Sequence, residues 1–219
     1  MRDQQPSPAN TPIAGPSADY VLAQLESAGA ALEFSSELLD FDRFHTDDLR
    51  NRLLAQYDGG AEYTRLRAFC KSSATNLLDL IESFGPHATV CNLLTLALAR
   101  RYSPDALAEL SREALDHWIR TLSIACAARR IAALRGSSTE SMHRVYAAGL
   151  LHEVGVFVLM ESFPRAVRRA LDRSRVAQKP INVCEVEILG TDHLVIGRRT
   201  LLRAAMPEWL IDAAWLHER

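Results

Sequence analysis

The sequence predicts an all-α protein. Apolar residues recur at spacings of three and four along most of the 219 residues, as one face of a helix requires. No stretch alternates apolar and polar side chains for long enough to predict a β-strand. Residues that favour helix caps, together with glycines and prolines, divide the chain into successive helices.

The N-terminal half is expected to hold five helices after a disordered tail. The tail, residues 1–17, carries four of the nine prolines and little that could be buried. A first helix begins near Ala18, and a second contains the acidic pair Asp47 and Asp48, which suits the positive end of a helix dipole. Three more helices are predicted over 63–69, 77–80 and 90–102, and the last is apolar enough to be central.

The C-terminal half should begin with a helix capped by Ser103, with Pro104 at its first position. An amphipathic helix over 112–134 follows from an apolar stripe at helical spacing: Leu115, Trp118, Ile119, Leu122 and Cys126. Gly136 ends this helix.

Cap signals then predict the remaining helix starts. Ser137 and Glu140 have the spacing of a capping box, and so do Asn182 and Glu185. The other expected boundaries are Pro164, which starts a basic helix, Gly190, which stops a short one, Thr191, which caps the next, and Pro207, which opens the last.

Composition excludes several classes of protein. No apolar run approaches the roughly 18 residues of a membrane span, and residues 1–17 lack the apolar region of a secretion signal. The four cysteines have neither metal-knuckle nor disulfide-framework spacing, which is typical of a cytoplasmic protein. Residues 129–203 hold 13 basic and 7 acidic side chains, and such a bias can mark an interaction surface. The pI of 6.4 lies well below the value of about 9 typical of dedicated nucleic-acid binders.

One segment stands out as the candidate site. Residues 147–155, Ala-Ala-Gly-Leu-Leu-His-Glu-Val-Gly, lie inside a long apolar helical pattern. A histidine beside a carboxylate, His152-Glu153, is costly to bury there without partners. Either His152 is a hydrogen-bonded core residue with Glu153 at the surface, or the pair lies at the edge of a cleft. Gly149 and Gly155 lower helix propensity and predict close packing of the backbone.

A second segment follows at residues 190–197, Gly-Thr-Asp-His-Leu-Val-Ile-Gly, and then Met206-Pro207 and a closing helix that ends in His217. Together the two segments resemble the HDOD family, a degenerate branch of the HD and HD-GYP metal-dependent phosphohydrolases. The resemblance is strong over 111–219. In the N-terminal third, only Ser73-Ala74 and the spacing of the family's motif are retained. The resemblance implies an HD-like multi-helix bundle over 18–219, with a divergent N-terminal helical subdomain (18–102) and an HD-like core (103–219).

The resemblance also implies that the metal site is vestigial. HD enzymes hold their metal with a histidine on one helix, a His-Asp doublet on another and a later aspartate. Here the register of Trp118 puts Thr121, and not His117, at the first histidine. Glu153 replaces the doublet aspartate, and Val156 replaces the lysine that follows. The vestigial positions are Thr121, His152, Glu153 and His217.

We therefore expect no enzymatic activity, metal or other cofactor. The surviving polar residues are expected to form a network that orders the core: His152, Glu153, Asp192 and His193. The resemblance implies a non-catalytic bacterial signalling module that acts in the cytoplasm through contacts with other signalling proteins. Its partner surface would include the basic helix, through Arg165, Arg168, Arg169 and Arg173.

Two alternatives stay open. The first is a degenerate HD-type phosphohydrolase that still binds a metal or a nucleotide. The second is nucleic-acid binding through the helix over Arg165–Arg175, where no aromatic residues interleave the arginines as single-strand binding would favour.

Overall fold

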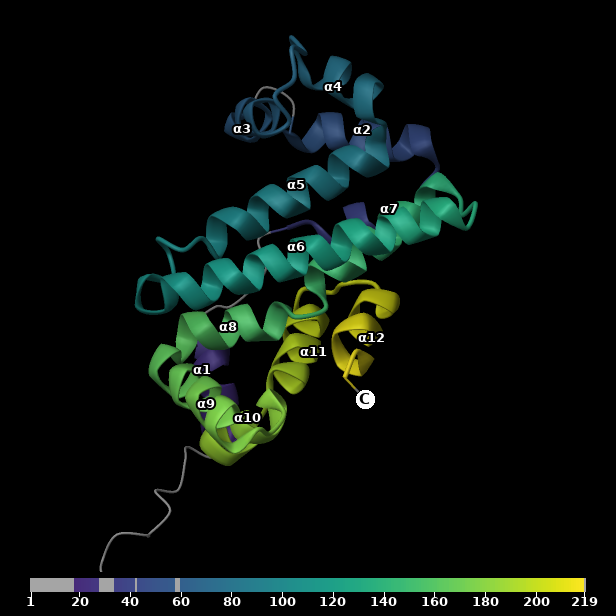
Figure 1. The fold of residues 1–219 in the computed structure, drawn as a ribbon. Helices are drawn as coiled ribbons and strands as arrows, with labels where there is room; N and C mark the ends of the chain where they lie inside the picture. Colours follow the sequence, from purple (N-terminus) through teal and green to yellow (C-terminus); the bar gives the residue numbers. More distant parts are fainter. Residues whose placement is uncertain (1–17, 28–33, 42, 58–59, 219) are drawn as a thin grey trace, which may run out of the picture.

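The computed structural model describes residues 18–27, 34–41, 43–57 and 60–218, and within these ranges the chain is helical with no β-strand (Figure 1). The tail predicted over 1–17 lies outside them. The elements in order are α1 (Ala18–Ser27), η1 (Ser36–Leu39), α2 (Thr46–Tyr57), α3 (Ala61–Phe69), α4 (Leu77–Phe84), α5 (Pro86–Arg101), η2 (Ala108–Leu110), α6 (Ser111–Leu134), α7 (Thr139–Leu151), α8 (Val154–Ser162), α9 (Pro164–Ala177), α10 (Ile181–Leu189), α11 (His193–Arg203) and α12 (Glu208–Leu216).

Helix α5 is central to the N-terminal part, as its apolar sequence predicts. It packs against α2, α3 and α4, and its other side contacts α7. Gly85 adopts a φ of 82°, which glycine allows and which lets the chain turn directly from α4 into α5. Buried side chains from both expected subdomains form one cluster, which joins α1–α5 to the C-terminal helices.

Helices α6 and α7 share the most extensive contact of any helix pair that the structure describes. A Cβ atom added to Gly149 on α7 would lie 2.6 Å from the Cα atom of Ala125 on α6, so only small side chains fit the crossing. The face that α6 buries is consequently made of small and polar residues: Ala114, His117, Thr121, Ala125 and Ala132. An apolar stripe usually faces the core, but here Leu115, Ile119 and Cys126 stay exposed, while Trp118 and Leu122 are half-buried.

Helices α7 and α8 together form a longer apolar stretch than the sequence analysis expected. Residues Thr139–Ser162 are long and apolar enough to cross a membrane, although we expected no such stretch. In the fold, 61% of the most apolar window is buried by other parts of the chain, as in the core helix of a soluble protein.

Helix α8 is flanked by α9 and α11. Helix α11 lies against α8 and α12, and α9 pairs with α10. A Cβ atom on Gly155 would collide with the carbonyl oxygen of His193 and lie 2.6 Å from the amide nitrogen of Gly197. The close packing predicted at Gly149 and Gly155 is thus confirmed.

Several predicted caps are wrong by a residue or more. Ser103 caps a turn that leads into η2, so no helix begins at Pro104. Ser138, not Ser137, caps α7 by accepting from the amide of Ser141.

The cap of α10 is also wrong, because Pro180 occupies the N-cap position where Asn182 was expected. Asp192, not Thr191, caps α11. Neighbouring polar residues compete for one cap, and their spacing alone does not decide between them.

Candidate functional site

The His-Glu doublet lies at a break between two helices. The continuous helical pattern expected around 147–155 is interrupted, because α7 ends at Leu151 and α8 begins at Val154. Adjacent side chains on one helix would point about 100° apart. At this break, the Nε2 atom of His152 instead lies 3.9 Å from the Oε2 atom of Glu153.

Three more histidines gather at this break from distant parts of the sequence. His117 comes from α6, His193 from the start of α11, and His217 follows α12. The ring centre of His217 lies 5.0 Å from that of His152 and 5.8 Å from that of His193. On the other side of the doublet, the Nε2 atom of His117 is 3.4 Å from the Oε2 atom of Glu153. We call this set the histidine cluster: His117, His152, His193 and His217.

Hydrogen bonds orient three of these rings in the same way. The Nδ1 atom of His152 lies 2.9 Å from the carbonyl oxygen of Gly149, and that of His217 lies 3.2 Å from the carbonyl oxygen of Ala214. The Nδ1 atom of His193 lies 2.6 Å from the carboxylate of Glu185. These oxygens only accept, so each Nδ1 carries the proton, and a neutral ring keeps a lone pair at Nε2. This tautomer is typical of histidines that bind a metal.

His117 has the opposite tautomer. Its Nδ1 atom lies 2.7 Å from a guanidinium nitrogen of Arg120, which only donates, so Nδ1 accepts and Nε2 carries the proton. Burial lowers the pKa of His117 to about 4, so the ring is neutral at pH 7. The geometry therefore makes His117 a donor toward Glu153 and not a metal ligand.

Glu153 is ionised although it is largely buried. Burial opposes its charge, but His117, Arg120 and His152 outweigh this effect and hold the pKa of Glu153 below its ordinary value. The Nε atom of Arg120 lies 3.8 Å from the Oε2 atom of Glu153. The permanent charge of Arg120 therefore already compensates the carboxylate of the doublet.

A cavity of about 420 Å³ opens beside the histidine cluster. Among the described residues, four buried atoms of the histidine cluster and its doublet lack a hydrogen bond of ordinary geometry: Nε2 of His117 and Oε2 of Glu153, which lie 3.4 Å apart, and Nε2 of His193 and of His217. Buried polar atoms without partners are uncommon and often indicate a bound ion or water.

The donors suit a metal ion of one class. Donor atoms of His193, His217 and Glu218 all lie within 4.8 Å of one another. A site with two imidazoles and a carboxylate fits zinc, nickel, cobalt or iron(II) better than magnesium, which prefers oxygen ligands. The residues present thus fit a metal, with His152 as the nearest additional imidazole.

The charge of the cavity favours a cation over a phosphate. Five carboxylates line it: Glu113, Asp116, Glu153, Glu185 and Glu218. Only two arginines, Arg120 and Arg175, oppose them. An anionic nucleotide would meet net negative charge here.

The predicted polar network differs from the one that forms. His152, Glu153 and His193 lie at the cluster, but Asp192 does not join them: its Oδ1 atom accepts from the amide of Val195, 2.9 Å away, as the cap of α11. Thr121 is buried in α6 with no partner for its hydroxyl.

Glu185, which sequence reasoning treated as a capping residue, is the carboxylate that binds His193. Its Oε2 atom accepts from both Nδ1 and the backbone amide of that residue. Burial of the His193 ring opposes its charge, but the contacts with Glu185 outweigh this, so the pKa of His193 is raised. The available signal was a glutamate on an otherwise apolar helix face, between Cys184 and Leu189.

The basic helix α9 is largely paired within the chain. Arg173 binds Glu187 on α10. Arg168 lies 4.0 Å from Glu113, and its guanidinium donates to the carbonyl of Glu109. Arg165 is 4.0 Å from the carboxylate of Glu109, although its side chain is 93% exposed. Among the four predicted partner-binding arginines, Arg169 makes no ion pair with a described residue.

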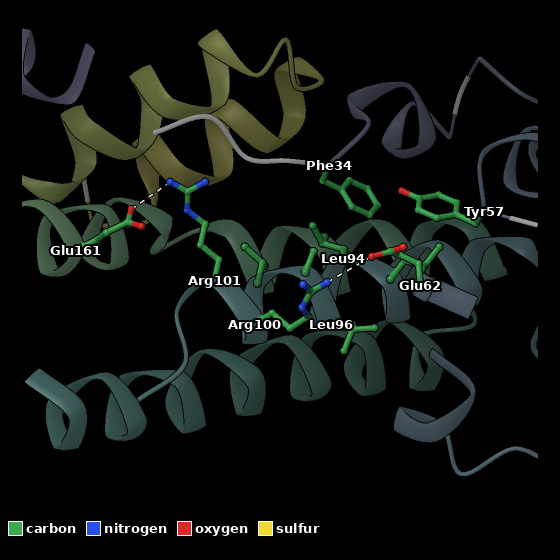
Figure 2. A pocket seen from close by; sticks show the side chains of 11 residues that line it. Phe34, Tyr57, Glu62, Leu94, Leu96, Arg100, Arg101 and Glu161 are labelled. Atoms are coloured by element: carbon green, nitrogen blue, oxygen red, sulfur yellow. Dashed lines mark hydrogen bonds and ion pairs between the residues drawn. The ribbon is translucent and has the colours of Figure 1, made fainter. Parts of the chain in front are cut away.

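A second cavity, about 360 Å³, lies against α5 (Figure 2). Leucines of α5 form its floor, with Phe34 and Tyr57 on one side. Two ion pairs line its rim, Arg100 with Glu62 at 3.4 Å and Arg101 with Glu161 at 3.2 Å (Figure 2). No histidine or cysteine lines this cavity, so the polar chemistry of the described residues is concentrated at the histidine cluster.

Comparisons with known proteins agree with this fold and identify the family. The family model of the HDOD domain matches residues 81–219. Among solved structures, an HDOD-domain protein of unknown function from Geobacter sulfurreducens is 20% identical, with a TM-score of 0.62 over 92% of this chain and 70% of its own. A protein from Shewanella amazonensis, provisionally assigned as a phosphohydrolase, is 16% identical, with a TM-score of 0.64 over 91% and 71%. No protein of curated function matches the sequence. The match covers more than half of the chain, which therefore belongs to the HDOD family.

Proposed function

We propose that this HDOD domain is a non-catalytic regulatory module, which acts in bacterial cytoplasmic signalling through contacts with other proteins. One observation carries the non-catalytic part: the doublet carboxylate, Glu153, is held by Arg120 and His117. A guanidinium 3.8 Å from the carboxylate competes with a metal for the same negative charge. The resemblance adds that Thr121 and Val156 replace two residues of active HD enzymes.

An activity assay tests this proposal directly. Purified protein is loaded separately with manganese, iron(II), nickel and magnesium, and offered a nitrophenyl phosphodiester and phosphomonoester. The wild type should turn over no faster than its His193→Ala variant. Metal-dependent turnover that the wild type shows and the His193→Ala variant lacks would overturn the proposal.

The regulatory part is tested in the source bacterium. The transcripts that change when the gene for this chain is deleted define its regulatory output. In the deletion strain, a copy that carries His152→Ala should restore this output. A copy that carries Arg169→Glu should not, because Arg169 is exposed on α9 and makes no ion pair with a described residue. Arg67→Glu, the same charge change on the exposed side of α3, is the matched control. The opposite pattern, with output lost in His152→Ala alone, contradicts the proposal.

A metal-dependent phosphohydrolase is the second candidate, and a specific observation favours it. Three imidazoles of the histidine cluster (His152, His193 and His217) have the tautomer of metal ligands, and Glu218 lies beside two of them. A metal held there would supply Lewis-acid activation of a phosphate ester. Elemental analysis of protein purified without chelator should find metal that is lost in His217→Ala if this candidate is right.

Binding of phosphate-bearing ligands has less support. The acidic lining of the cavity disfavours a nucleotide, and internal ion pairs compensate most arginines of α9. Nucleic-acid binding would show an affinity that falls steeply with salt.

A further inference from the structure

Helix α6 uses only one of its faces within the chain. It packs against α7 and touches η2, and at its N-terminal end it also contacts Phe157 of α8 and Arg168 of α9. The face packed on α7 consists of small and polar side chains. Figure 1 shows α6 along the outside of the molecule, in front of α7. A helix of 24 residues is about 36 Å long, so its outward face is an extended surface.

The outward face carries the apolar stripe of the helix. Leu115 is 44% exposed and Ile119 is 55% exposed. Successive members are four and three residues apart, in the order Leu115, Ile119, Leu122, Cys126, Arg129 and Ala133. Five of these six are apolar, and alternation of three and four is the spacing of a coiled-coil seam. We call these six residues the α6 seam.

Two unpaired charges flank the α6 seam on the same side. Asp116 follows Leu115, and Arg130 follows Arg129, so the two occupy equivalent positions two heptads apart. Both are exposed, and neither makes an ion pair with any residue in the part of the chain that the structure describes. They have opposite sign and lie seven residues on either side of Ser123.

We propose that the α6 seam binds a second copy of this chain, with the two α6 helices antiparallel around a two-fold axis near Ser123. In an antiparallel pair, the equivalent flanking positions of the two helices face each other. Asp116 of one copy then lies opposite Arg130 of the other, and the symmetry repeats the pair. A parallel pair would instead place each charge opposite the other flank of the partner helix, at Ser111 and Ala125, where no charge complements it.

The surface fits a weak, reversible dimer. One helix pair buries less than the roughly 1,200 Å² at the low end of stable interfaces. The dissociation constant is therefore expected on the order of tens of micromolar. Asp116 also lines the polar cavity, so the dimer would form at the edge of that cavity.

Charge reversal gives a test with its own control. Asp116→Arg and Arg130→Asp each create two repulsive contacts in a homodimer, so sedimentation equilibrium should show at least a tenfold weaker dimer for each. Mixed together, the two variants restore both attractive pairs, and the heterodimer should match the wild type. Circular dichroism confirms that each variant is folded.

Two outcomes overturn the inference. Wild-type protein that stays monomeric at several hundred micromolar would show that this face does not bind a second copy and is left for another partner. A dimer that both single variants leave unchanged would place the interface elsewhere on the molecule.

Discussion

At the scale of single residues, Gly155 is the least replaceable position in the fold. An added Cβ atom would collide with backbone atoms of His193 and Gly197, which cannot rotate away as a side chain could. We expect Gly155→Ala to lower the free energy of unfolding by about 3 kcal/mol, as overpacking does, despite its better helix propensity. Urea denaturation measures this. Gly60→Ala, whose Cβ atom would meet nothing closer than 3.6 Å, should cost at most about 1 kcal/mol, because Gly60 only caps α3. Equal effects would contradict the close packing.

The buried pair of Glu185 and His193 predicts a second residue-scale effect. In Glu185→Gln the carboxylate that raises the pKa of His193 is gone, while burial of the ring remains. The pKa of His193 should therefore fall from its raised value, although Glu218 and Glu153 still support its charge, as NMR titration of the metal-free protein would show. Removing one partner of a buried pair also costs roughly 3 kcal/mol of stability.

Glu187→Gln is the matched control for that experiment. Glu187 pairs with Arg173 and Lys179 at the surface, where the loss should stay below about 1 kcal/mol. A pKa of His193 that does not fall in Glu185→Gln would show that its charge depends on other groups.

At the scale of elements, Asp192 caps α11 and does not belong to the polar network. Asp192→Ala should therefore cost about 1 kcal/mol, the typical value for a lost N-cap. Asp192→Asn keeps an acceptor for the amide of Val195 and should be nearly neutral. If the asparagine variant is as unstable as the alanine variant, the charge of Asp192 has a role beyond the cap.

The helices themselves were predictable from local patterns, but the directions of their faces were not. Most helices lie within a few residues of where apolar spacing and capping residues place them, although no helix begins at Pro104 and the break between α7 and α8 was not predicted. The orientation of α6 depends on Gly149, 24 residues away from Ala125 in the sequence, because the close crossing admits only small side chains. Likewise, Glu185 reaches His193 only because α10 and α11 fold back on each other. Contacts of this kind are set by packing between elements and leave no local signal.

At the scale of the whole molecule, the candidate site was predictable in part. The doublet and His193 were identified from motifs, whereas His117 was rejected on its register beside Trp118. The structure brings His117 to Glu153 because α7 breaks at the doublet and exposes the carboxylate toward α6. Neither His152 nor Glu153 is a proline or glycine, so the sequence contains no signal for a helix break at the doublet itself.

The buried histidines together predict how the stability of the molecule depends on pH. Burial is the main cause that lowers the pKa values of His87, His117, His143 and His217 in the folded chain, and that of His117 falls to about 4. Above the unfolded value of about 6.5 these rings are neutral in both states, so they add no pH dependence. As the pH falls below 6.5, only the unfolded chain binds the protons, and the free energy of unfolding decreases.

His193 acts in the opposite sense, since its raised pKa adds stability that is present below 6.5 and lost as the pH rises through the folded value. Four depressed groups outweigh one raised group, so stability should fall between pH 6.5 and 4. Urea unfolding across that range measures the slope. His87 and His143 stack 6.2 Å apart, away from the histidine cluster, and a His87→Gln, His143→Gln variant should have a shallower slope. An unchanged slope would mean that these two rings are protonated in the folded chain, and that the contact between α5 and α7 is looser than its burial indicates.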